Sequence, residues 1–576
     1  MKWKQAFEAI HAMEEFGDSA LGAWAVALQF GYDDFEHIAT ECITDGNDDK
    51  KCDFIHIDKE TNIAVIGQCY YTLKSKVSAP SNKASDLNTA VAWLLSNEIE
   101  KIPVGIRTHA TELRKGIENG TITDVHFWYV HNLPESKNVE IELERVQASA
   151  DALIKRNFTT ATIQVHAKEL GTNELESLYQ DTTVSILVDR EYKIKTTGHY
   201  ATKGENWEAI ATAIPGSFIH KLWKEHKNKL FSANVRDYMG TKSSDTNINN
   251  GIQKSAKESP NDFWVFNNGL TVLSNNFSID KSGELTISGI SIVNGAQTSG
   301  AIGGLTKQPL KSMLIPARFI KTSNQSLLLD IIRFNNSQNK VTASDFRSTD
   351  RIQKRLREEI QNVPNTEYEG GRRGGAADRI QKRPNLMPSY TVGQAIASFH
   401  QDPINAYNKK SEIWVDDAIY SKVFPDSITG NHLIFCYSLL KEVEEKKKNL
   451  IKLWKADPTS INVDENLLAF FRKRGATIIF ATGIAACIEI LADRKIPNSF
   501  KISFGDKIGI RESRKYWKDI IDVCAAFVAQ FDSALNTGLQ NSAEISRSVS
   551  NFVSMMKATK GPNKSVYTKF AKNLKF

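Results

Sequence analysis

An aspartate and a glutamine on two neighbouring predicted strands are the side chains in this sequence best suited to chemistry on a phosphate. Asp53 opens the first predicted strand, residues 53–58, and Gln68 lies on the second, residues 62–71. This pairing places two oxygen donors side by side, and Mg²⁺ prefers hard oxygen ligands. A metal-dependent phosphodiesterase also needs a cation or a water-activating group near the phosphate. The pattern therefore indicates a candidate magnesium site for phosphodiester cleavage.

The two strands belong to a longer stretch in which strands and helices alternate. A short polar turn, residues 59–61, joins them and is typical of a hairpin. Further strand-like segments at 124–129 and 160–165 have helical sequence patterns between them. The N-terminal third is therefore predicted to be an α/β domain whose mixed sheet positions the candidate site.

This layout resembles the restriction-endonuclease-like, PD-(D/E)xK superfamily. In that family an acid from a preceding helix, the aspartate that opens the hairpin and a Gln/Glu-x-Lys phrase on the next strand converge. The resemblance implies that Asp53 and Gln68 bind Mg²⁺. It also implies a helical acid in the same site, either Glu36 or Glu41. The family's catalytic lysine is replaced in this chain by Tyr70.

Tyr70 is the main departure from the family pattern. Residues two apart on a strand face the same side, so a neutral phenol stands where an ammonium group would supply positive charge. Lys74 has the same parity but lies about 13 Å further along an extended strand. Lys50 and Lys51, beside Asp53, are the other candidate cations. Two hypotheses follow: an active nuclease with a substitute cation, or a nuclease-like fold without catalysis that binds nucleic acid or supports the rest of the protein.

Three phrases rich in asparagine form a second candidate site in the middle of the chain. They are NNGLTV at 267–272, IVNGAQT at 292–298 and FNNSQNKV at 334–341. Each lies beside an apolar stretch, and amide side chains are costly to bury without partners, so the cluster predicts a hydrogen-bonded network or a polar ligand site. Any one phrase alone is typical of a turn, because Asn-Gly is a common hairpin signal.

The order of these phrases resembles the abortive infection phage resistance (AIPR) family of bacterial defence proteins. The upstream phrase LFSANVRDYMG at 230–240 and the downstream phrase YEGGRRG at 368–374 fit the same pattern. The match spans roughly residues 180 to 400. The resemblance implies antiphage defence, and a restriction-endonuclease-like domain often precedes this family's core.

More distantly, the core resembles proteins with a DGQHR phrase and a ParB-like fold, in which polar phrases line a cleft that can hold a nucleotide. That resemblance implies a nucleotide or nucleic-acid pocket in this chain. Its predicted lining residues are Asn268, Asn294, Gln297, Asn336, Gln338 and Arg347. Arg372 and Arg373 add a candidate anion site, because neighbouring glycines let the backbone approach a phosphate and guanidinium groups suit phosphate oxygens. A solvated helix face is the plainer explanation for this basic region.

The chain is too long for one hydrophobic core, at 576 residues. We expect three parts: a restriction-endonuclease-like domain at 1–180, an α/β AIPR core at 181–390 and a helical C-terminal domain at 391–576. Helix-period patterns dominate the last part, for example at 432–453 and 469–491. The predicted fold class is therefore α/β, followed by a helical region.

Composition indicates where the protein works and what it binds. The longest weakly polar run, residues 476–487, is shorter than the ~18 apolar residues that a membrane span needs, and the charged N-terminus is unlike a signal peptide. We therefore expect a cytoplasmic protein without membrane contact. A net charge of +6 permits nucleic-acid binding without requiring it. The six cysteines include no CxxC pair and are expected to be reduced core residues.

The last twenty residues, 557–576, contain six lysines, no acid and three aromatic residues. Such a segment could either bind a nucleic-acid backbone or serve as a solubilising terminus.

The sequence as a whole predicts a bacterial antiphage protein with two alternative modes of action. In the first it is a Mg²⁺-dependent nuclease that cleaves nucleic acid. In the second its nuclease-like fold is silent, and it senses nucleic acid, a nucleotide or a phage-derived trigger; an effector acting through assembly would also require oligomers.

Overall fold

The chain forms two compact units. The computed structural model describes residues 2–30, 32, 34–44, 46, 48–180, 188–226, 230, 245–280, 282–310, 312–322, 324, 327, 331, 347, 350–370, 385–457, 459–461 and 463–576. One unit combines Met1–Leu175 with Thr342–Phe576, and we refer to it as the discontinuous unit. The other, Glu176–Val341, is the central unit. The predicted boundaries near residues 180 and 390 stay predictions.

A four-stranded sheet lies in the N-terminal part of the discontinuous unit, in the order β1-β2-β3-β4. β1 (Phe54–Asp58) is antiparallel to β2 (Ile63–Tyr70), whereas β2, β3 (Asp124–His131) and β4 (Gln164–Leu170) run parallel. The first two strands agree with the predicted hairpin to within one residue. The predicted strand at 160–165 was misplaced, because the chain first makes a turn in which the Ala161 N–H donates to the carbonyl of Phe158.

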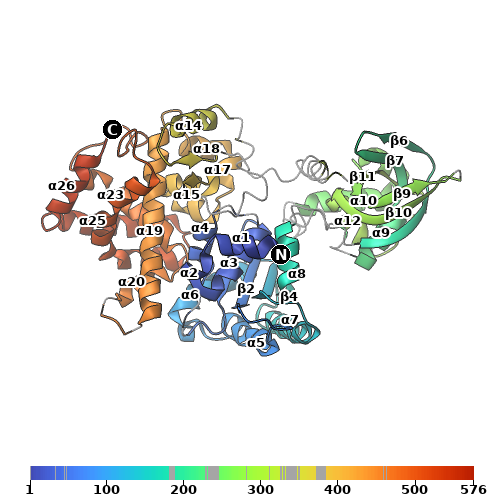
Figure 1. Ribbon diagram of the computed structural model, residues 1–576, viewed down its shortest axis with the longest axis horizontal. Coiled ribbons are helices and arrows are strands. Elements are labelled where there is room, and N and C mark those ends of the chain that lie inside the picture. Colours follow the sequence, from blue (N-terminus) through green and yellow to red (C-terminus); the bar gives the residue numbers. More distant parts are fainter. Residues whose placement is uncertain are drawn as a thin grey trace. The chain divides into compact units, whose positions relative to one another are not determined.

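Helices cover both faces of this sheet (Figure 1). α5 (Ser81–Leu95), α6 (Val104–Glu118) and α7 (Lys137–Asn157) share one hydrophobic core with the sheet. On the other face, α3 (Ala20–Phe30) approaches closely, because a Cβ on its Gly22 would lie only 2.3 Å from the ring of Phe54. The apolar run of β2 is thus buried on both sides, as expected for a central strand of a sheet that helices cover on both faces.

A helical region makes up the C-terminal part of the discontinuous unit. Its longest helix, α19 (Gly430–Ala456), packs against α15 (Ser389–Phe399), α21 (Ala476–Ala486) and α23 (Ile510–Ala525) (Figure 1). α19 confirms the helix predicted at 432–453. The remaining elements of this unit are α1 (Lys2–Ala9), α2 (Ala12–Phe16), α4 (Phe35–Cys42), α14 (Arg351–Gln361), β12 (Glu367–Tyr368), β13 (Leu386–Met387), α16 (Pro403–Asn408), α17 (Glu412–Val415), α18 (Asp417–Val423), α20 (Glu465–Phe471), α22 (Ile488–Ala492), α24 (Asp532–Asn536), α25 (Ser542–Ala558) and α26 (Lys564–Asn573).

The helix predicted at 469–491 is instead divided into α20, α21 and α22. Gly475 interrupts the pattern before α21, because its φ of +76° is incompatible with a continuous right-handed helix. Within the lysine-rich terminus, residues 564–573 form α26. Tyr567 and Phe570 are buried in the helical core, and Phe570 packs against Trp517 with ring centroids 5.0 Å apart. These two rings are therefore not exposed for stacking on bases.

Buried ion pairs join the N-terminal sheet region to the C-terminal helices within this unit. Glu112 of α6 accepts from Arg474 and pairs with Lys59, both at 2.6 Å. His37 of α4 lies 2.5 Å from Glu444 of α19. Unpaired charges are costly to bury, so these matched pairs specify how the two parts of the chain pack.

The central unit is built on a curled, seven-stranded sheet (Figure 1). Its order is β5-β10-β8-β11-β7-β6, and β9 pairs with β10. The elements are α8 (Thr172–Gln180, which begins in the discontinuous unit), β5 (Val188–Lys195), β6 (His199–Lys203), β7 (Trp207–Pro215), α9 (Gly216–His226), α10 (Asp245–Glu258), α11 (Phe263–Phe266), β8 (Leu270–Leu273), β9 (Asn276–Ile279), β10 (Glu284–Asn294), α12 (Ala296–Gly303) and β11 (Leu314–Thr322). Apolar residues of α9, α12 and the strands form its core.

All six cysteines are free and buried, which confirms that they are core residues. None of the helices in the described part of the chain combines the length and the apolar character that a bilayer crossing requires.

Candidate functional site

The structure places Asp53 beside Gln68 at the open end of the β1–β2 hairpin. The Asp53 N–H donates to the carbonyl of Gly67 at 2.9 Å, and the Cys69 N–H donates to the Asp53 carboxylate at 2.6 Å. The carboxylate is therefore held next to the backbone of Gln68. Gln68 is 3% exposed, and its Oε1 has no hydrogen-bond partner among the described residues. A buried amide oxygen without a donor is costly, so a cation bound between these oxygens would satisfy it.

Tyr70 lies two residues beyond Gln68, and two lysines that the sequence did not single out lie close to it. The Lys76 ammonium donates to the Tyr70 hydroxyl at 2.7 Å. Lys83 lies 5.7 Å from the centre of the same ring. The hydrogen bond from Lys76 holds the pKa of Tyr70 below its usual value. The Tyr70 phenol is thus hydrogen-bonded to one ammonium group and lies close to a second lysine.

The lysines that the sequence did single out have other contacts. Lys50 forms an ion pair with Asp48 and lies 4.5 Å from the centre of the Trp93 ring. Lys51 pairs with Asp86 at 3.4 Å. For Lys74, the backbone N–H donates to the Thr72 hydroxyl at 3.1 Å. Lys76 therefore supplies the ammonium group that is hydrogen-bonded to the Tyr70 hydroxyl.

A further carboxylate lies in line with Gln68 across the sheet. Gln68 is the register partner of Tyr129 on β3, which is in turn the partner of Glu169 on β4. Glu169 accepts a 2.9 Å hydrogen bond from His131, whose side chain is fully buried. The carboxyl ends of the parallel strands β2, β3 and β4 meet at one edge of the sheet. Glu169 lies close to the carboxyl end of β4, as Gln68 does in β2, and this shared position was the signal that could have identified Glu169.

Glu41, one of the two candidate helical acids, faces the C-terminal helices. Its carboxylate accepts from the Thr477 hydroxyl at 2.9 Å and lies 3.7 Å from the Lys447 ammonium. Burial acts to raise the pKa of Glu41, but nearby cations, Lys447 foremost, outweigh it and lower the pKa. Glu36 lies in the first turn of the same helix. The choice of helical acid stays a prediction.

Two of the predicted asparagines meet in the central unit. Asn268 and Asn294 line one pocket of about 970 Å³. Three other lining residues were not among those predicted for the pocket: Trp264, which is 48% exposed, Thr271 and Arg318. The Arg318 guanidinium donates to the Thr271 hydroxyl at 3.1 Å. The pocket thus combines amide groups, an aromatic ring and a cation.

The other predicted lining residues are not part of that pocket's described wall. Gln297 lies in α12 just after Asn294, and its side chain lies outside the described part. Arg347 belongs to the discontinuous unit, where it pairs with Asp417 and lies 4.2 Å from the centre of the Tyr420 ring. The remaining predicted binding residues lie outside the described ranges: Asn336, Gln338, Arg372 and Arg373.

Comparison with known families concerns the central and C-terminal residues. A family model described as AIPR protein matches residues 231–543, which is more than half of the chain. The chain belongs to the AIPR family. AIPR membership implies abortive-infection phage resistance. The AIPR match begins later than the resemblance noted in the sequence and extends further into the C-terminal helices. No curated protein and no solved structure matches the chain.

Proposed function

We propose that this AIPR protein is a metal-dependent nuclease whose active site lies at the open end of the β1–β2 hairpin. The observation that carries the proposal is the buried Oε1 of Gln68, which has no hydrogen-bond partner in the described part of the chain and lies beside the Asp53 carboxylate. The antiparallel hairpin followed by two parallel strands is also the arrangement expected for the restriction-endonuclease-like interpretation. Oxygen donors of this kind suit Mg²⁺ or Mn²⁺.

Each group at the hairpin has a role in this proposal. Asp53 and Gln68 would hold the ion through oxygen atoms, with Glu41 or Glu36 as the helical acid. When bound, the ion would supply charge neutralisation at the phosphate and a more acidic water. In this proposal the ammonium group of Lys76 would lie beside the scissile phosphate, and Tyr70 would orient that group through the hydrogen bond between them. Phosphate esters carry negative charge that increases near the leaving oxygen, so a fixed cation favours cleavage.

The test is digestion of plasmid DNA, single-stranded DNA and RNA by the purified chain with Mg²⁺ or Mn²⁺. We expect cleavage that falls at least about 100-fold in Asp53→Ala, because one removed electrostatic partner commonly costs that much. Asp48→Ala is the matched control, since it removes a carboxylate from the preceding exposed turn. Cleavage that persists in Asp53→Ala would contradict the proposal. Activity that appears only in Tyr70→Lys would instead indicate a silenced fold.

A second candidate function is nucleotide recognition in the central pocket. It is favoured by the shared lining of Asn268, Asn294 and Arg318, because amides can bond base edges and a guanidinium suits phosphate oxygens. Calorimetric titration with adenine and guanine nucleotides tests it. We expect binding that weakens at least about tenfold in Asn294→Ala, corresponding to the loss of one to two hydrogen bonds. The exposed Asn206→Ala is the control, and a chain that binds none of these nucleotides would refute this function.

A further inference from the structure

Three side chains of metal-ligating types meet on β3 and β4, well away from Asp53 and Gln68. Asp124 and His126 are two residues apart on β3 and therefore face the same side of the sheet. The register pairs His126 directly with His166 on β4. Tyr129, the partner of Gln68, is five residues beyond Asp124 and has the opposite parity. The cluster thus lies at the other end and on the other face of the sheet.

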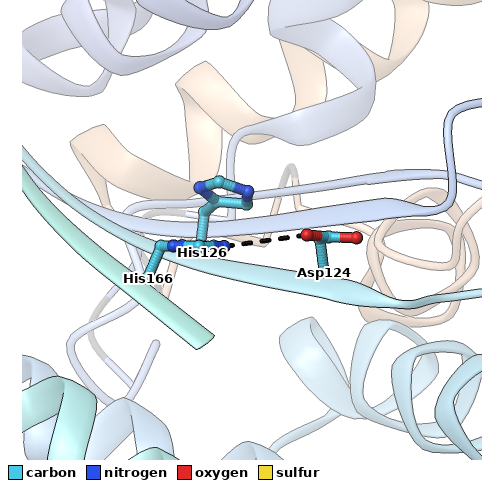
Figure 2. Close-up of side chains that lie close together, drawn as sticks. All are labelled: Asp124, His126 and His166. Carbon is cyan, nitrogen blue, oxygen red and sulfur yellow. Dashed lines mark ion pairs between the residues drawn. The ribbon is translucent and has the colours of Figure 1, made fainter. Parts of the chain in front are cut away.

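The side chains converge tightly. One ligand atom from each of Asp124, His126 and His166 lies within 4.8 Å of the other two. The His166 Nε2 is 3.7 Å from the Asp124 carboxylate, and the two imidazole rings stack with centroids 4.6 Å apart. Figure 2 shows the His126 ring above the His166 ring, and the dashed line marks the ion pair between His166 and the Asp124 carboxylate.

We propose that Asp124, His126 and His166 form a binding site for a zinc-like divalent ion. Two imidazoles and one carboxylate favour Zn²⁺ over Mg²⁺, which prefers an all-oxygen shell. Zinc bonds of about 2.0–2.2 Å require ligand atoms roughly 3–3.5 Å apart, so the side chains must close by about 1 Å. His166 is free to do so, because its side chain is 41% exposed on the edge strand β4.

The ion would connect the edge strand to its neighbour and would keep a coordination position open to water. Three protein ligands are typical of zinc sites that bind an exchangeable water, whereas structural sites normally use four. This site shares no residue with the proposed nuclease site. It therefore stands or falls independently of that function.

The experiment is a titration of the untagged, full-length, metal-free protein with Zn²⁺, followed by calorimetry, and with Co²⁺, followed by visible absorption. We expect one ion to bind per chain. Its affinity should fall at least about 100-fold in His166→Asn, His126→Ala and Asp124→Asn, because even residues that only hydrogen-bond to a metal ligand contribute about 10–100-fold to affinity. Zn²⁺ should also raise the melting temperature of the wild type but not of His166→Asn. Mg²⁺ in excess should not compete.

Two control variants define the alternatives. His11→Ala removes an exposed histidine that lies 3.1 Å from Glu14 and should leave zinc binding unchanged. Asp53→Ala should also leave it unchanged, and loss of binding there would move the ion to the nuclease site and overturn the proposal. Absence of binding in the wild type, or undiminished binding in His166→Asn, would overturn it too. If His126→Ala fails to fold, the half-exposed His166→Asn decides.

Discussion

The ammonium of Lys76 donates a 2.7 Å hydrogen bond to the hydroxyl of Tyr70. This contact brings a positive charge to the last residue of β2, two positions after Gln68. β2 ends at Tyr70, and the chain then bends, so Lys76 returns to a position that an extended strand would not let Lys74 reach. Two residues six positions apart in the sequence, Tyr70 and Lys76, therefore meet through one hydrogen bond.

If Lys76 replaces the motif lysine, its removal should slow cleavage without affecting the fold. We expect Lys76→Ala to lower the initial rate at least about tenfold, because it removes a fixed cation from the phosphate. Tyr70→Phe should have a smaller effect, since it removes only the hydrogen bond. Initial rates on the preferred substrate measure both. Lys74→Ala is the matched exposed control, and equal rates for the two lysine variants would argue against a role for Lys76.

Glu112 should make the stability of the discontinuous unit depend on acidic pH. Burial acts to raise its pKa, but Arg474 and Lys59 outweigh that effect and lower the pKa to about 2. The stabilisation is present above the ordinary pKa near 4.5 and is lost as the pH falls from there toward 2. It amounts to about 3 kcal/mol. The Glu112→Gln variant should lack this stabilisation at pH 7, and its free energy of unfolding should change less between pH 7 and acidic pH.

Urea unfolding of the wild type and Glu112→Gln between pH 3 and 7 measures this difference. The control is Glu98→Gln, because Glu98 pairs with Lys101 on the surface, where both side chains are 69% exposed. Exposed pairs contribute about 0–1 kcal/mol, so the control should resemble the wild type. Equal stability losses in the two variants would show that the buried pairing of Glu112 is unimportant.

Gly269 should be essential for the central pocket. Its φ is +82°, and a Cβ there would lie 2.4 Å from the carbonyl oxygen of Pro316. Gly269→Ala therefore combines a strained backbone with a clash, and we expect a loss of at least about 1–3 kcal/mol. Gly198→Ala is the control, because Gly198 lines the same pocket and a Cβ there meets nothing within 4 Å. Thermal melting compares the two, and equal melting temperatures would contradict the prediction.

The lysine-rich terminus should contribute to stability through its aromatic residues. Phe570 is 3% exposed and packs against Phe504 and Trp517. Phe570→Ala should destabilise the protein by about 3–5 kcal/mol, as expected for a buried phenylalanine. Lys572→Ala, two residues along the same helix, should have little effect. Chemical unfolding measures both variants, and a Phe570→Ala protein as stable as the wild type would show that this helix does not belong to the core.

Local patterns in the sequence determined several features correctly. The hairpin around Asp53 and Gln68 followed from strand alternation and a polar turn, both of which depend on a few adjacent residues. The buried cysteines followed from the apolar residues around them, and the ordered asparagine phrases indicated the AIPR family. Asn268 and Asn294 come together because Asn268 lies two residues before β8, Asn294 is the last residue of β10, and these two strands pair.

Only the tertiary structure decided which distant residues meet. Asp124 and His166 lie on adjacent strands, although α7 separates them in the sequence. Likewise, Glu41 contacts Thr477, more than 400 residues away, because the N- and C-terminal parts fold into one unit. Such contacts depend on which apolar faces pack against one another. The hydrophobic periodicity of one segment shows that the segment has an apolar face, but it does not show which other segment covers that face. For this reason Lys76 beside Tyr70 and the cluster of Asp124, His126 and His166 could be recognised only in the folded chain.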